Sequence, residues 1–114
     1  MSHKLTSNQS IIYNAETQAS GTLEIHAEQI IYQDDGGDYH NVMLQMPVKL
    51  SGSNGYVTNL NYNITSEDWN TFFASQTLVS TNEYDKQAEA SLNYVKTQID
   101  GRWGLNEEDW TYSS

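Results

Sequence analysis

Alternating apolar residues dominate one stretch of the chain and set narrow limits on its fold. Apolar side chains occupy every second position at Val42, Leu44, Met46, Val48 and Leu50. Successive side chains of a β-strand point to opposite faces, so this stretch predicts a strand with one buried face. Such a strand needs partner strands and a covering layer, because its apolar face must be removed from water.

A second alternating run precedes this dominant strand and contains one change of parity. Leu23 and Ile25 alternate with polar residues, and Ile30 resumes the alternation one position out of step. An inserted residue near Glu28 explains the change, because a β-bulge adds one residue without turning over the rest of the strand. The acidic, glycine-containing segment 34–38 then predicts a hairpin turn into the dominant strand.

A further turn and a third alternating run follow the dominant strand. The turn, residues 51–55, consists of serine, glycine and asparagine. Folding the chain about this turn pairs Met46 with Leu60, and folding it about the first turn pairs Ile30 with Val42. Both alignments place apolar partners on the same side, so the three runs predict an antiparallel meander with one buried face.

The apolar period changes from two to about 3.6 after Thr65. Thr65 and Asp68 have the spacing of a helix-start capping box, and they predict a short helix. A longer amphipathic helix is expected over 81–100, and Gly101 is expected to end it in the left-handed conformation. The apolar stripe of this helix consists of Tyr84, Ala88, Leu92, Val95 and Ile99.

These patterns together predict an α+β fold. We expect an antiparallel β meander of three to five strands with a C-terminal amphipathic helix packed on one face. The length suits one domain over 1–114. Within it we expect a flexible N-terminus over 1–10, a β-rich part over 11–64, a helical part over 65–101 and an aromatic, acidic C-terminal arm over 102–114.

The charge of the chain excludes several function classes. The sequence has 15 acidic and 5 basic residues, a net charge of −10 at pH 7, and no cysteine. Phosphate backbones and anionic membranes bind basic surfaces, so we expect neither direct nucleic-acid binding nor membrane docking. The absence of cysteine excludes disulfides and thiolate chemistry. Without a secretory pattern or a long apolar run, we expect the protein in the cytoplasm where it is made.

Candidate metal ligands are few and poorly spaced for a metal site. They are the three histidines and one acidic cluster: His3, His26, His40, Asp34, Asp35 and Asp38. The cluster does not match the spacing of an EF-hand loop, and the predicted registers separate the histidines. We therefore expect a hairpin turn and exposed surface histidines. No nucleophile elbow, phosphate loop or dinucleotide motif occurs, so we predict no enzyme activity and no cofactor.

Aromatic residues are the best candidates for contact surfaces. Tyrosine and tryptophan are enriched in protein interfaces, and the expected C-terminal arm contains several of them. The arm packs either on its own domain or on a neighbour. The interface candidates are Trp103, Leu105, Trp110, Tyr112 and Tyr56. Edge strands at 11–13 and 56–64 add backbone groups that can pair with another subunit.

The chain resembles the small virion proteins of tailed bacteriophages, such as tail, neck or head-decoration subunits. The shared traits are strands rich in Asn, Thr, Ser and Tyr, the lack of cysteine, the scarcity of Lys and Arg, and the polar arm. This resemblance implies a structural subunit that acts through contacts with itself or with other virion proteins. One alternative is an acidic, phage-borne inhibitor of a nucleic-acid-binding host defence protein. A second alternative is a carbohydrate-binding module that stacks aromatic rings on sugars.

Overall fold

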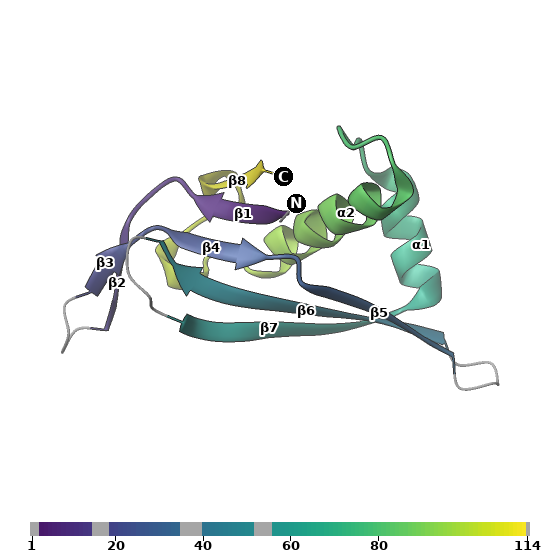
Figure 1. Cartoon of the computed structure of the whole chain (residues 1–114), viewed down its shortest axis with the longest axis horizontal. Helices are drawn as coiled ribbons and strands as arrows, with labels where there is room; N and C mark the ends of the chain where they lie inside the picture. Colours follow the sequence, from purple (N-terminus) through teal and green to yellow (C-terminus); the bar gives the residue numbers. More distant parts are fainter. Residues whose placement is uncertain (1–2, 15–18, 35–39, 52–55, 114) are drawn as a thin grey trace.

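A computed structural model describes residues 3–14, 19–34, 40–51 and 56–113 of the protein (Figure 1). Its elements in chain order are β1 (Lys4–Ser7), β2 (Ile11–Asn14), β3 (Ala19–Gly21), β4 (Leu23–His26), β5 (Gln29–Asp34), β6 (His40–Leu50), β7 (Tyr56–Thr65), α1 (Ser66–Ser75), α2 (Glu83–Gln98), two 3₁₀ turns (Arg102–Gly104 and Glu107–Asp109) and β8 (Trp110–Ser113). The fold is α+β.

The described strands form one six-stranded antiparallel sheet and a separate ribbon of β2 and β3. The expected meander of three to five strands is therefore too small, because β1 and β8 also join the sheet. The long strand β6 is central, with β7 along one side and β4 and β5 in turn along the other. β1 pairs with β4, and β8 pairs with the free side of β1. In Figure 1 the β2–β3 ribbon lies at the opposite end of the molecule from α1.

The predicted strand registers are confirmed on one side of β6 and shifted on the other. Met46 pairs with Leu60, as expected from the second turn. The expected pair of Ile30 and Val42 is wrong, because Ile30 pairs with Leu44. A shift of two residues keeps every side chain on its face, so the alternation of apolar residues does not distinguish the two registers.

The expected β-bulge near Glu28 is instead a break between two separate strands, β4 and β5, which pair with different parts of β6. β4 pairs with the end of β6, and β5 pairs with its first half, while residues 27–28 belong to neither strand. The backbone N–H of Ala27 instead donates to the carbonyl of His3 at 2.9 Å. This break turns β5 away from β4 and leaves it beside the start of α2.

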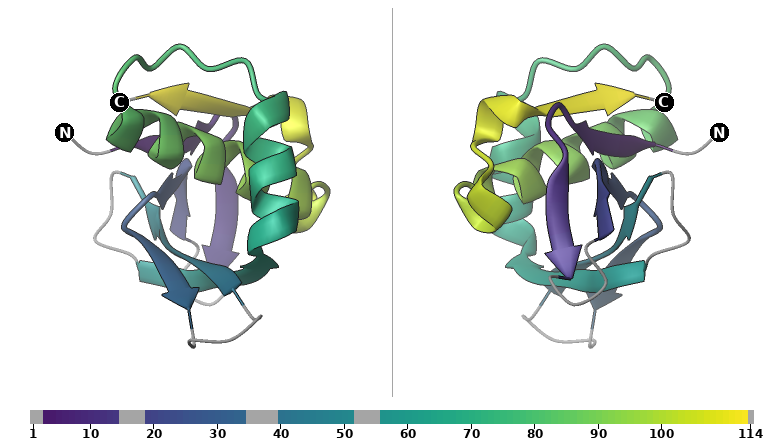
Figure 2. Two further views of the ribbon diagram at one scale, coloured as in Figure 1. Left: turned by 90° about the vertical axis from the view of Figure 1, so that its right-hand side faces the viewer. Right: turned by 90° about the vertical axis from the view of Figure 1, so that its left-hand side faces the viewer.

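Both helices cover the same face of the sheet, with α1 running steeply across α2 (Figure 2). Thr65 caps α1 by accepting a hydrogen bond from the Asp68 N–H at 3.2 Å, which confirms the predicted start. Gly101 follows α2 with φ of 86°, which confirms the predicted left-handed stop. The core lies between the helices and the sheet and includes Leu5, Leu23, Ile25, Leu44, Met46, Leu92, Val95, Leu105 and Trp110.

Three expectations about the chain need correction. Residues 1–10 were expected to be flexible, but 4–7 form β1, where Leu5 is fully buried. The amphipathic helix was expected at the C-terminus, but β8 follows it and is the last element. Tyr84 was expected in the apolar stripe of α2, but it is 75% exposed, because the first turn of the helix extends beyond the core.

Candidate functional site

The outer edge of β7 is the longest sheet edge in the described part of the chain. β7 has ten residues and pairs with β6 over almost its whole length. No described strand pairs with its other side. Every second backbone N–H and C=O of an edge strand points away from the sheet, so this edge presents a row of donors and acceptors to a further strand.

The residues of β7 lack the usual features that prevent edges from pairing. Its sequence, YVTNLNYNIT, contains no charged residue and no proline. Asn59, Asn61 and Asn63 are exposed on the outer face, whereas Leu60 and Ile64 are buried against the helices. Soluble proteins commonly protect an edge with lysine, proline or an inward charge. The β7 edge is therefore open to pairing.

His3 lies at the centre of a buried chain of hydrogen bonds. Only 3% of His3 is exposed, and its Nε2 lies 2.8 Å from Oδ1 of Asp85. Its Nδ1 lies 2.6 Å from the hydroxyl of Tyr112, whose ring stacks on the imidazole at 6.0 Å. One arrangement that satisfies both contacts has Nε2–H donating to the Asp85 carboxylate and Nδ1 accepting from the Tyr112 hydroxyl.

This His3 chain joins three elements that are far apart in the sequence. His3 precedes β1, Asp85 lies in the first turn of α2, and Tyr112 lies in β8. Burial raises the pKa of the Tyr112 phenol above its ordinary value of 10.0, although the Ser80 hydroxyl acts in the opposite direction. Both nitrogens of the buried imidazole are engaged within the protein. The chain therefore ties β8 and the residue before β1 to the first turn of α2.

A buried acid, Glu89, fixes the segment before α2. The Glu89 carboxylate accepts hydrogen bonds from the Val79 N–H at 3.1 Å, the Ser80 N–H at 3.0 Å and the Ser80 hydroxyl at 2.7 Å. Glu89 is only 4% exposed. Buried carboxylates require such partners, and here the donors fix the loop between the helices. This contact is structural.

The remaining histidines and acids do not form a metal site in the described residues. The expectation that His3 is exposed is wrong. His26 Nε2 lies 3.1 Å from Oε1 of Glu24, and Lys4 Nζ donates to the other carboxylate oxygen, Oε2, at 3.3 Å. Burial alone would raise the pKa of Glu24, but these hydrogen bonds lower it below the ordinary value of 4.5. Asp35 and Asp38 lie outside the described residues, as do the side chains of Asp34 and His40.

The C-terminal interface candidates pack mainly on their own domain. Leu105 and Trp110 are 2% and 4% exposed, and Trp103 contacts Trp110 edge-on with ring centroids 6.2 Å apart. Tyr112 is partly buried and belongs to the His3 chain. The side chain of Tyr56 lies outside the described residues. The residues that the structure brings together at an open surface are instead the asparagines of β7.

The sequence predicted two possible edge strands, 56–64 and 11–13, and did not distinguish between them. The 11–13 strand is paired with β3 in the separate ribbon. The length of the uncharged run 56–65 is the sequence feature that distinguishes this strand from 11–13. The buried chain around His3 had no local signal, since its partners are 82 and 109 positions away.

Comparisons with known proteins identify no relative of this chain. No protein-family model, no curated protein and no solved structure matches it. None of the described helices is long and apolar enough to cross a membrane.

Proposed function

We propose that the protein is a non-enzymatic assembly subunit that acts through protein–protein contacts, with the outer edge of β7 as its main contact. The observation that carries this proposal is a ten-residue, uncharged edge strand without a partner strand among the described residues. Strand addition at such an edge supplies a ladder of main-chain hydrogen bonds. The asparagines on the outer face add side-chain amides that can hydrogen-bond across the new strand pair.

The occupant that best fits this edge is a second copy of the chain. Two β7 strands that pair antiparallel across a two-fold axis present the same polar residues to each other, as an isologous interface requires. A charged partner strand gains nothing from β7, since the strand carries no charge. The pairing would extend the sheet across both subunits and keep the helices of both on one face.

A virion is the setting that we favour for this assembly. The support is the compositional resemblance to small structural proteins of tailed phages, in which contact itself is the function. The carbohydrate-binding alternative has less support, because Trp69 and Trp110 are only 2% and 4% exposed and are not available to stack on a sugar. The net charge of −10 is the observation that supports the inhibitor alternative. Salt-dependent binding to a basic nuclease would add to that support.

Light scattering on the purified protein tests the proposal. We expect a mass that is a multiple of the 12.9 kDa chain. In the double variant Asn61→Lys/Asn63→Lys, lysines would face lysines across the β7 pair, and we expect the mass to fall to that of one chain. Both positions are exposed, so the fold should tolerate the change.

The matched control is Asn70→Lys/Gln98→Lys, which adds the same charge at exposed positions on the two helices. This control should assemble as the unmodified protein does. A monomeric unmodified protein, or equal masses for the two double variants, would remove the support for β7 as a contact.

A further inference from the structure

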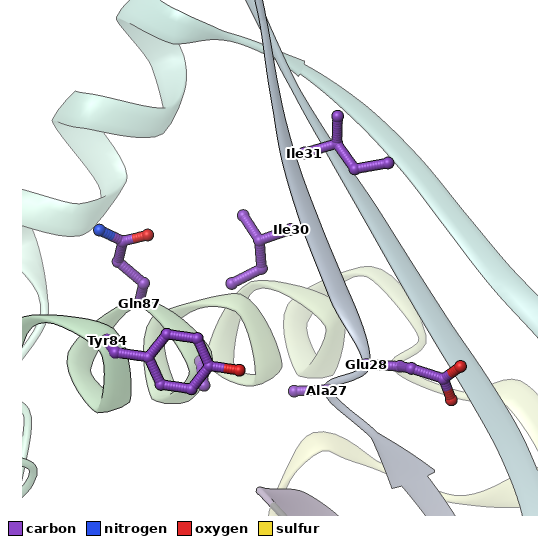
Figure 3. A pocket seen from close by; sticks show the side chains of 7 residues that line it. Ala27, Glu28, Ile30, Ile31, Tyr84 and Gln87 are labelled. Carbon is purple, nitrogen blue, oxygen red and sulfur yellow. The ribbon is translucent and has the colours of Figure 1, made fainter.

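A groove lies between β5 and the first turns of α2 (Figure 3). Its volume is about 370 Å³, which falls in the range of roughly 300–1,000 Å³ typical of binding pockets. Ala27 and Ala88 line it with small side chains that leave space between the strand and the helix. Ile30 and Tyr84 come from the two sides of the groove, as Figure 3 shows.

The Tyr84 ring is unusually exposed for a large side chain. It is 75% exposed, and Val79, at 78%, is the other large apolar side chain with such exposure in the described residues. Val79 lies in the loop before α2 and does not line the groove. An exposed ring beside an apolar groove provides a wall that a bound side chain can pack against.

The backbone of β5 is available along the same groove. All six residues of β5 pair with β6 on one side. On the other side no strand of the described chain pairs with β5. β1 pairs with β4, and the nearby hydrogen bond from the Ala27 N–H to the His3 carbonyl lies before β5 begins. An extended segment can therefore pair with β5 and place alternate side chains into the groove, as in strand addition next to a helix.

The charges around the groove favour a basic occupant. Glu28 is exposed at one end of the groove, and in Figure 3 its carboxylate points away from Tyr84 and Gln87. Glu83 is exposed one helical turn before Gln87, and positions four apart lie on the same side of a helix. Lys86 lies on the side of α2 opposite Tyr84, and it is three positions after Glu83, so these two side chains are neighbours on the helix surface. The whole chain carries a net charge of −10.

We propose that the groove between β5 and α2 binds an extended, basic peptide segment of a partner protein. The segment pairs with the free edge of β5 and places an apolar side chain between Ile30 and Tyr84. Lysine or arginine on alternate positions faces the acidic surroundings. This surface is separate from the β7 edge, and the inference does not depend on self-assembly through β7.

A rhodamine-labelled octapeptide in which lysine alternates with valine and leucine is the probe. We expect saturable binding by fluorescence anisotropy and slower amide hydrogen exchange over β5. Tyr84→Ala should weaken the binding about tenfold, which corresponds to about 1.4 kcal/mol. Val79→Ala, which removes the other exposed apolar side chain, should leave the affinity unchanged.

N-methylated versions of the probe separate strand pairing from charge attraction. Alternate N–H groups of a strand point to opposite sides, so methylation of one set blocks pairing with β5 and methylation of the other set does not. We expect only one of the two peptides to bind. Equal binding of both, unchanged affinity for Tyr84→Ala, or no saturable binding would overturn the inference. The single variant Asn63→Lys, which changes β7 away from Glu28, should bind the probe normally, which distinguishes this groove from the β7 edge.

Discussion

Replacing Trp110 with alanine tests whether the C-terminal segment is part of the core. Trp110 begins β8, is 4% exposed and contacts Trp103. A buried tryptophan removes about 150–250 Å² from water. At roughly 25 cal/mol per Å² this burial stabilises the fold by about 4–6 kcal/mol. Measured costs of Trp→Ala in cores are about 3–5 kcal/mol, so we expect a loss of about 4 kcal/mol.

Such a loss is a large part of the stability of a domain of this size, which is typically about 5–15 kcal/mol. Urea denaturation followed by far-UV circular dichroism measures it. With a slope of about 2 kcal/mol per M, the midpoint should fall by about 2 M. Trp103→Ala serves as the control, because Trp103 is only partly buried and should cost less. A Trp110→Ala variant within about 0.5 kcal/mol of the unmodified protein would refute the docking of this segment on its own domain.

Two further predictions concern the buried and partly buried polar groups. Tyr112→Phe removes the hydroxyl that is hydrogen-bonded to His3 Nδ1 and leaves that nitrogen unsatisfied, so thermal unfolding should report a loss of about 1–3 kcal/mol. The folded state lowers the pKa of Glu24 below 4.5, so the stability from this carboxylate is present above pH 4.5 and is lost as the pH falls through its folded-state pKa. Glu24→Gln should remove that part of the acid dependence in urea titrations between pH 6 and pH 3; an unchanged pH profile would contradict this assignment.

Local patterns predicted the elements whose partners are close in sequence. The β6–β7 register follows from the turn at 51–55 together with the alternation on both sides, and Met46 does pair with Leu60. The start of α1 at Thr65 and the stop at Gly101 follow from capping chemistry and from backbone freedom. In each case the physical cause of the structure lies within a few neighbouring residues.

Such local patterns do not predict contacts between segments that are far apart in the sequence. β1 and β8 are four residues each; they pair with each other from opposite ends of the chain, and β1 also pairs with β4. Strands this short contain too few alternating residues to stand out. His3 was interpreted as exposed because its burial depends on Asp85 and Tyr112, which the fold brings to it.

The candidate site was predictable in part. The apolar alternation marks 56–64 as a strand, but whether a strand is at an edge depends on the order of all the others. The groove beside β5 depends on the break after His26 and on the position of α2, so no sequence motif marks it.

Hydrogen exchange of the β7 amides at several protein concentrations tests the central claim most directly. Residues whose N–H groups point out of the sheet should exchange rapidly in dilute solution. The account predicts that their protection rises with concentration, in step with the mass measured by light scattering, while exposed amides of the helix-linking loop stay unprotected. Assembly without any gain of protection over 56–65 would contradict it.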